Sequence, residues 1–318
     1  MREDIMSYTI IEEGIAKAKE IPTWSSVLVE YNHSKHPNEY ICYDMNFSSV
    51  DLLSTTITGM CDAFLSIVKK YDKKVIDYTG ENPKNVVDKL STNNTVISTC
   101  WNFLIEHINN SDDTTNFKHI KANAYVFIGS YTLSDGTSEN IYLITRKNPL
   151  LTYKKGRTPI FTSQNNTIAK ADEPLVQFSK SFDAIVYKNT MYMINNNCES
   201  IFNMEYTHKI LCKKHLSELE AANIIANFEN YDSFASSGQN PKKFITYDAS
   251  IVEKLTQTKW KNKLAKDLKI PLDSTTKKFD LHEEANARKF TLAICGKTKL
   301  NMFDDGICEV PSSTPLII

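Results

Sequence analysis

Two β-prone runs joined by a turn decide the fold class: Ala124-Tyr-Val-Phe-Ile-Gly-Ser-Tyr131, Ser134-Asp-Gly-Thr137 and Asn140-Ile-Tyr-Leu-Ile-Thr145. β-Branched and aromatic residues fill both runs, and the Asp-Gly pair between them favours a tight turn. The segment therefore predicts an antiparallel β-hairpin. A second hairpin is predicted over residues 182–194, with Lys188-Asn189 as its two-residue turn.

Segments with helical periodicity lie on both sides of these hairpins. Within residues 50–71, for example, Leu53, Ile57, Phe64 and Val68 fall on one face of a helix. Helices are predicted over residues 7–19, 50–71, 84–89, 96–108, 198–211, 217–227 and 250–266, and further strands over 26–31, 39–44 and 74–78. The predicted fold class is α+β, with an N-terminal mixed α/β module followed by a C-terminal module of antiparallel β-hairpins plus helices.

The clearest linker is the run Asn109-Asn-Ser-Asp-Asp-Thr-Thr-Asn116, which holds no apolar side chain. It predicts a boundary between an N-terminal module, residues 1–116, and a C-terminal module, residues 117–318. The first module has 17 acidic and 10 basic residues, and the second has 21 acidic and 27 basic residues. Opposite net charges favour contact between the modules, within one chain or in a homodimer.

Cysteine usage and hydropathy indicate the compartment. The seven cysteines form no C-x-x-C pair, and most lie in apolar surroundings such as Ala293-Ile-Cys295. This usage is typical of buried thiols in a reducing compartment. Residues 1–15 are mixed and charged, and no apolar run approaches the roughly 18 residues that a membrane span needs. These features predict a soluble, cytoplasmic protein.

Two basic segments differ from the rest of the chain. Residues 141–171 contain six Lys or Arg residues and no acid, and residues 254–269 contain six Lys around Trp260, opposed only by Asp267. Clustered cations on a fixed scaffold favour a polyanion, and a nucleic-acid backbone is the obvious candidate. The predicted DNA-binding residues are Arg146, Lys147, Lys154, Lys155, Arg157, Lys259, Lys261, Lys263 and Lys266. Each segment alone is equally explained by a solvated surface, either a basic hairpin that keeps a sheet edge soluble or an exposed helix face.

The common catalytic motifs are absent from the sequence. It has no P-loop, no G-x-G-x-x-G, no H-E-x-x-H and no G-x-S-x-G motif, so no catalytic residue and no cofactor are predicted. A metal-dependent nuclease is the alternative, because Asp183, Glu199, Glu205 and Lys209 supply carboxylates and a Lys near predicted strand and helix ends. A third interpretation is a protein-interaction module whose basic face meets an acidic partner.

Two groups of histidines raise the question of a metal. His33 and His36 have no further ligand at a suitable spacing, which favours a surface loop. His208, Cys212 and His215 follow one another at spacings of four and three, which fits either a metal triad or a buried helix face. No metal site is predicted from either group.

The order of several runs carries a resemblance to a known family. These runs are Tyr125-Val-Phe-Ile-Gly-Ser-Tyr131, Ile141-Tyr-Leu-Ile-Thr-Arg-Lys147, Phe182-Asp-Ala-Ile-Val-Tyr187, Met191-Tyr-Met-Ile-Asn195 and Cys198-Glu-Ser-Ile-Phe-Asn-Met-Glu205. Together they resemble the C-terminal domain of the KwaB family, the second component of the bacterial Kiwa antiphage system. Glu199, Ile201 and Phe202 match the motif that opens a helix in the family, and Cys198 replaces a Phe. The resemblance covers about residues 120–310 and includes the tail Leu300-Asn-Met-Phe-Asp-Asp-Gly-Ile307.

The resemblance implies a function that composition does not. Proteins of this family are cytoplasmic, bind DNA, and block phage DNA replication and late gene expression. They act with a membrane-embedded partner, KwaA, that senses phage at the envelope, and they are binding effectors without an established catalytic triad or cofactor. We therefore expect an antiphage defence effector that binds DNA independently of sequence and forms a homodimer. A KwaA-like partner is expected to recruit it from the cytoplasm to the inner membrane.

Overall fold

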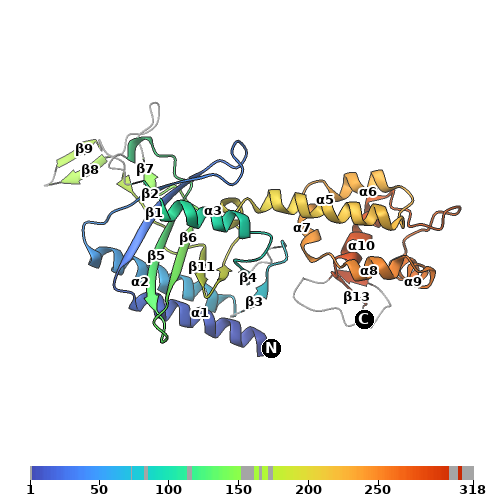
Figure 1. Cartoon of the computed structure of the whole chain (residues 1–318), viewed down its shortest axis with the longest axis horizontal. Helices are drawn as coiled ribbons and strands as arrows, with labels where there is room; N and C mark the ends of the chain where they lie inside the picture. The colour runs from blue at the N-terminus through green and yellow to red at the C-terminus, as the bar shows by residue number, and fades with distance from the viewer. Residues whose placement is uncertain are drawn as a thin grey trace. The chain divides into compact units, whose positions relative to one another are not determined.

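The computed structural model describes residues 2–72, 74–81, 85–112, 117–151, 161–164, 167–170, 175–300 and 307–309. The chain divides into two compact units. A sheet unit contains Met1–Ile76 and Lys84–Met204, and a helical unit contains Asp77–Pro83 and Glu205–Ile318. Figure 1 shows the long strands in the first and the helices α5 to α10 in the second.

Among the described residues, eight strands form one sheet in the order β2-β1-β5-β6-β11-β12-β4-β3. Their bounds are β1 Trp24–Tyr31, β2 Tyr40–Asp44, β3 Val75–Asp77, β4 Val87–Ser91, β5 Ala124–Thr132, β6 Ser138–Thr145, β11 Ala184–Tyr187 and β12 Thr190–Met193. The pairings from β2 to β4 are antiparallel. Three two-stranded sheets accompany it: β7 Leu150–Leu151 with β10 Leu175–Val176, β8 Phe161–Gln164 with β9 Thr167–Lys170, and β13 Thr298–Leu300 with β14 Ile307–Glu309.

Both predicted hairpins are confirmed. β5 pairs with β6, and β11 pairs with β12 so that Tyr187 lies opposite Thr190. Lys188 and Asn189 have φ angles of 49° and 55°, the two successive left-handed residues that a two-residue type I′ turn requires. With its antiparallel sheet and separate helices, the protein has the predicted α+β fold.

The main sheet continues across the linker at residue 116. β1 precedes the linker and β5 follows it, yet the two strands pair, with Leu28 opposite Tyr125. Toward the opposite edge of the sheet, β4, which precedes the linker, pairs with β12, which follows it. The predicted division at residue 116 therefore does not coincide with the division into compact units, because strand pairing joins segments from both sides of the polar run.

Helices cover both faces of the main sheet (Figure 1). On one face, α1 (Arg2–Glu20) and α2 (Val50–Lys70) bury their apolar sides in a cluster that also contains Leu28, Tyr125, Leu143 and Ile185. On the other face, Trp101 of α3 (Ser98–Asn109) meets Tyr142 edge-on, with ring centroids 5.1 Å apart. Residues 124–128 of β5 are consequently all buried, on both faces of the strand.

Helix α2 is long and apolar enough to cross a membrane by length and composition alone. Its apolar residues nevertheless form one stripe that packs in the core of the sheet unit, and the ring of Phe64 stacks on Phe182 with centroids 4.4 Å apart. Most of the remaining positions are polar, apart from the exposed Val50 and Leu52 in the first turn and the half-buried Leu65 and Ile67. The helix therefore has the amphipathic pattern of a core element.

Four predicted helices differ from the observed elements. The predicted helix over 84–89 is wrong, because Val87–Ser91 is the strand β4. The predicted helix over 198–211 is interrupted, since α4 (Cys198–Ile201) ends before Asn203, which has a left-handed φ of 49°, and α5 (Met204–Ala222) begins after it. The predicted helix over 217–227 is not separate, because α5 continues without a break to Ala222 and ends there. The predicted helix over 250–266 is divided into α8 (Ala249–Leu255) and α9 (Thr258–Leu268).

The helical unit has its own core. It is built from α5 (Met204–Ala222), α6 (Phe228–Ala235), α7 (Asn240–Lys243), α8, α9 and α10 (Glu284–Ile294). The rings of Tyr231, Phe279 and Phe290 are fully buried, and Phe279 and Phe290 lie 5.0 Å apart. The Tyr231 hydroxyl is within hydrogen-bond distance of Thr291 Oγ1, 3.0 Å away, so the buried polar end of the ring is satisfied.

Candidate nucleic-acid interface

Helix α9 presents a basic face. Its buried side consists of Ala265 and Leu268, while Lys259, Lys263 and Lys266 are exposed and fall at helical spacing on one side. Lys261 is half-buried and lies on a different side of the helix. Lys259, Lys263 and Lys266 therefore align on one face of the helix, and Lys261 does not belong to it.

Trp260 lies between two of these cations. Lys259 Nζ is 5.3 Å and Lys263 Nζ is 5.6 Å from the centre of the indole ring. At an exposed site, each cation–π contact contributes about 0.5–1 kcal/mol. The half-buried ring thus attracts both ammonium groups.

The first turn of α9 offers the helix dipole no negative side chain of its own. Its first turn contains no acid, and the side chain of the N-terminal residue Gln257 makes no capping hydrogen bond. Lys259 lies in this first turn, where a cation is unfavourable and an anion is favourable. The lysine and the helix N-terminus therefore add to one positive region that suits a phosphate group.

Helix α9 ends in a way that extends the basic surface. Lys269 adopts a left-handed conformation with φ of 53° and closes the helix through a backbone hydrogen bond to Ala265. Its side chain is exposed, as is that of Lys254 in α8. The basic segment identified in the sequence is thus a solvent-facing surface at most of its lysines.

The backbone at Arg146, in the first basic segment (residues 141–171), is held by a hydrogen bond. Arg146 follows β6, and its backbone N–H donates a 2.7 Å hydrogen bond to the carboxylate of Asp183. The side chain of Arg146 is exposed and that of Lys147 is half-buried. Lys154, Lys155 and Arg157 lie outside the described residues. Arg146 and Lys147 belong to the sheet unit and α9 to the helical unit, so they are considered as separate surfaces.

Two of the three carboxylates of the nuclease alternative, Asp183 and Glu205, have other roles. Asp183 Oδ1 accepts hydrogen bonds from Asn195 and Asn197, at 2.7 and 3.2 Å, so the buried carboxylate holds the turn before α4. Glu205 and Lys209 belong to the helical unit and form an ion pair of 2.7 Å with each other. Across the described residues, no group of three His, Cys, Asp or Glu side chains is placed to hold a metal ion.

One acidic residue was missed in the sequence. Asp88 of β4 is 96% buried, and its Oδ1 has no hydrogen-bond partner among the described residues. Burial, together with the smaller effect of the charge of Glu199, raises the pKa of Asp88 to about 7. Burial also raises the pKa of the Cys198 thiol, and the charges of Asp183 and Glu199 raise it further. The sequence analysis missed this carboxyl because it predicted a helix over 84–89. In the structure Asp88 lies in the strand β4, opposite Met193 of β12.

The histidines bind protein groups. His33 and His36 lie in the loop between β1 and β2, as predicted, and His36 is exposed. His33 is half-buried; its Nε2 donates to the carbonyl oxygen of Ile201 at 2.8 Å, and burial lowers its pKa. His208 is buried, with Nε2 3.3 Å from the Tyr78 hydroxyl, and the Cys212 thiol donates to the carbonyl of Ala235. His215 pairs with Glu218. These distinct partners fit the buried-helix interpretation of the His208–His215 spacing.

Comparison with known families decides the relationship. The family described as Kiwa protein KwaB-like matches residues 132–291, half of the chain. The chain belongs to this KwaB-like family. The match confirms the resemblance found in the sequence, and it extends from the first hairpin to α10, so that it includes both Arg146 and the basic face of α9. No curated protein and no solved structure matches the chain. Membership in the family indicates a protein of a Kiwa defence system.

Proposed function

We propose that this Kiwa protein is a DNA-binding effector that blocks phage DNA replication and late gene expression. The observation that carries the proposal is the face of α9, where exposed lysines, Trp260 and an uncapped helix N-terminus give one positive surface. Lysines bind phosphates as point charges and do not read base edges, so binding is independent of sequence.

The proposal includes location and assembly. A membrane-embedded KwaA-like partner recruits the protein from the cytoplasm to the inner membrane, where phage DNA enters. The opposite net charges of residues 1–116 and 117–318 favour a homodimer held partly by electrostatic attraction. Light scattering at moderate salt tests the assembly, with a dimer expected and a monomer at micromolar concentration against it.

The test of DNA binding compares two sets of charge reversals in the helical unit. Lys259→Glu, Lys263→Glu and Lys266→Glu together should weaken binding to all duplex sequences alike. The matched control reverses Lys213, Lys214 and Lys277, which are exposed lysines elsewhere in the same unit, and changes the net charge equally. The log–log dependence of affinity on salt should flatten by about 0.9 for each phosphate that the variant no longer neutralises. Equal affinities of wild type and the α9 variant at every salt concentration would reject the interface.

The predicted DNA-binding residues Lys154, Lys155 and Arg157 are tested in the same assay. Lys154→Glu, Lys155→Glu and Arg157→Glu together should also reduce affinity and the salt slope. In infected cells that also express the membrane partner, a variant that no longer binds DNA should fail to block phage DNA replication, measured by the number of phage genome copies.

The nuclease alternative is tested directly. Plasmid DNA incubated with the protein and Mg²⁺ or Mn²⁺ should remain intact. If the wild type cleaves the plasmid and Asp183→Asn or Glu199→Gln does not, the protein is a nuclease and the proposal of a binding effector is wrong.

A further inference from the structure

Helices α8 and α9 of the helical unit form a helix-turn-helix. Only Thr256 and Gln257 separate them, and the backbone of Gln257 is extended, with φ of -82° and ψ of 130°. The chain therefore changes direction between the two helices. Leu255 of α8 and Leu268 of α9 are buried in the same hydrophobic cluster, so the two helices pack in one core.

Both ends of this pair are fixed to the rest of the unit. The N–H of Asp248, which precedes α8, donates a 2.9 Å hydrogen bond to the carbonyl of Ile294 at the end of α10. After α9, Ile270 is buried in the same core, and its N–H donates to the carbonyl of Ala265 at 2.9 Å. Helix α9 is thus held on a rigid support, as a helix that contacts DNA with a defined side must be.

The exposed surface of α9 has two sides of different chemistry. Lys259, Lys263 and Lys266 form one side. Thr258 and Asn262, which are four residues apart and both exposed, form the other side. At about 3.6 residues per turn, the exposed positions span roughly 140° of the helix circumference. A cationic side and a neutral polar side therefore lie next to each other along the helix.

The neutral side of α9 holds no acid. The one acidic residue of α9, Asp267, is half-buried and lies across the helix from Thr258 and Asn262. In helix-turn-helix proteins the first helix crosses the phosphate backbone, and Lys254, exposed in the last turn of α8, supplies a cation there. Both helices thus have side chains suited to their places in such a complex.

These two sides fit the two surfaces that a major groove offers. The major groove is about 12 Å wide and admits an α-helix, whereas the minor groove, about 6 Å wide, does not. In the major groove, the lysines face the phosphates of one wall and the neutral side faces the base edges. An amide both donates and accepts hydrogen bonds, so Asn262 can meet different base edges and adds little sequence preference. A helix that lay along one strand would use its lysines alone.

Single-stranded DNA fits α9 less well. Proteins bind single strands with aromatic rings on which the bases stack. Trp260 is half-buried and contacts two ammonium groups, so it offers little free ring surface to a base.

We propose that α9 enters the major groove of duplex DNA, so that the protein recognises a duplex whose major groove is open. This inference rests on the proposed function and specifies the form of DNA. The phosphate contacts of the lysines supply the affinity, and access to the groove supplies the discrimination. A duplex with a filled major groove carries the same phosphates, yet it excludes the helix.

The test compares duplexes of one sequence by fluorescence anisotropy with the full-length protein. One duplex has ordinary cytosines, and in the second every cytosine is a glucosylated 5-hydroxymethylcytosine, whose sugar projects into the major groove. Affinity for the second duplex should be at least about tenfold weaker. The same duplex without the glucose is the control and should bind like ordinary DNA. Equal affinity for the ordinary and glucosylated duplexes, or tighter binding of the single strand, would overturn the proposal.

A neutral double variant tests the side that faces the bases. Thr258→Ala with Asn262→Ala should weaken binding to the ordinary duplex at least about fivefold, by the same factor at every salt concentration, because no phosphate contact is lost. Ala is the best helix former, so α9 should remain folded. Ser274→Ala with Thr275→Ala, at exposed positions of the same unit, is the control and should bind like wild type. Equal binding by the α9 variant and this control would also overturn the proposal.

The outcomes separate this inference from the proposed function. If neither duplex binds, or if reversing the charges of Lys259, Lys263 and Lys266 has no effect, the proposed function is wrong. If those reversals weaken binding but both duplexes bind equally, α9 contacts the phosphate backbone alone, and only its place in the major groove is wrong.

Discussion

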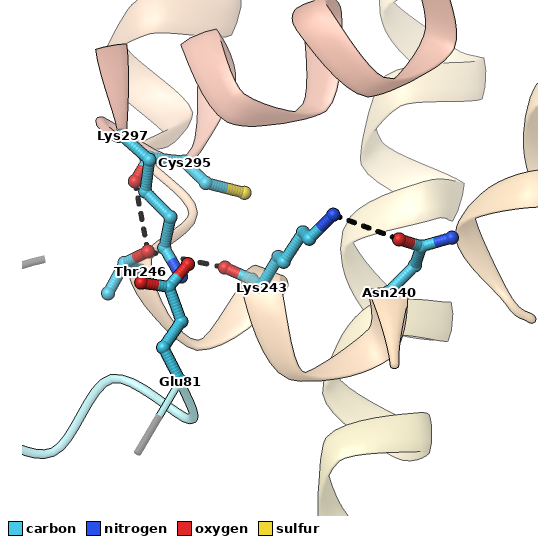
Figure 2. A network of polar contacts seen from close by, with 6 residues as sticks. All are labelled: Glu81, Asn240, Lys243, Thr246, Cys295 and Lys297. Carbon is cyan, nitrogen blue, oxygen red and sulfur yellow. Dashed lines mark hydrogen bonds and ion pairs between the residues drawn. The ribbon is translucent and has the colours of Figure 1, made fainter. Parts of the chain in front are cut away.

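Lys297 Nζ lies 2.8 Å from Glu81 Oε1, although 216 positions separate the two residues in the chain. The side chain of Lys297 is only 1% exposed and that of Glu81 is 26% exposed. Figure 2 shows this pair beside Thr246, whose hydroxyl donates to the carbonyl of Cys295 at 2.9 Å. Glu81, which lies between β3 and β4 in the sequence, thereby supplies the counter-charge of a buried lysine in the helical unit.

Glu81→Gln should destabilise the helical unit by roughly 3–5 kcal/mol, because it leaves a buried ammonium without a negative partner. Hydrogen exchange of α10 amides, followed by mass spectrometry, measures the effect. The double variant Glu81→Leu with Lys297→Met should recover most of the stability, since it removes both charges and fills the space with apolar groups. Glu283→Gln, at an exposed acid of the same unit, is the control. Equal exchange in Glu81→Gln and Glu283→Gln would show that the pair is dispensable.

Asp88 should make the stability of the sheet unit depend on pH. Its pKa in the folded state is about 7, above the ordinary 3.8, so the folded state binds the proton more tightly than the unfolded state. The resulting stabilisation is complete below pH 3.8 and is lost as pH rises through 7. The full shift corresponds to about 4 kcal/mol as an upper limit.

Urea unfolding at about pH 5 and about pH 8 measures this effect. Asp88→Asn cannot ionise, so its unfolding free energy relative to wild type should be higher at the upper pH. Glu199→Gln removes one cause of the raised pKa and should make the pH dependence of wild type smaller. The same difference between Asp88→Asn and wild type at both pH values would contradict the assignment.

The strands of both hairpins and the helix α2 were predictable because each depends on local pattern. Alternation and β-branched residues identified β5, β6, β11 and β12, and the spacing of Leu53, Ile57 and Phe64 identified α2. Local pattern does not predict which strands pair, since β1 pairs with β5 about a hundred residues away. The boundary at residue 116 was placed from composition, and composition carries no information about which strands pair across it.

In the candidate site, too, only the features that depend on local spacing were predictable. Spacing placed Lys259, Lys263 and Lys266 on one face, as the structure has them. The pairs Lys297–Glu81 and Asp88–Glu199 join distant segments, so no local pattern marks them. The break between α4 and α5 left only a weak signal, the Asn at position 203, because neither Pro nor Gly stands there.

Asn203 should therefore tolerate Gly but not a β-branched residue. Its φ of 49° lies in the left-handed region, which Gly adopts without strain and Asn more readily than most residues. Asn203→Val should lower the unfolding free energy by about 1–2 kcal/mol, whereas Asn203→Gly should leave it near that of wild type. Thermal unfolding followed by circular dichroism compares the variants. If Val and Gly have equal effects, the chain between α4 and α5 has no left-handed turn in solution.

Lys259→Glu should separate stability from DNA binding in a single residue. A carboxylate in the first turn of α9 interacts favourably with the helix dipole, by about 0.3–1 kcal/mol. The substitution also removes the cation–π contact between Lys259 and Trp260, which contributes about 0.5–1 kcal/mol. The contact of Lys263 with the same ring remains. The two effects offset each other, so the unfolding free energy should change by no more than about 0.5 kcal/mol.

DNA affinity should nevertheless fall, because an anion replaces a cation in the positive region at the start of α9. Fluorescence anisotropy with duplex DNA over a range of salt concentrations should show weaker binding and a log–log slope smaller by about 0.9. Lys213→Glu, at an exposed position of α5, makes the same change of net charge and should bind like wild type. If Lys213→Glu and Lys259→Glu reduce affinity equally, net charge rather than the face of α9 governs binding, and the phosphate contacts lie elsewhere.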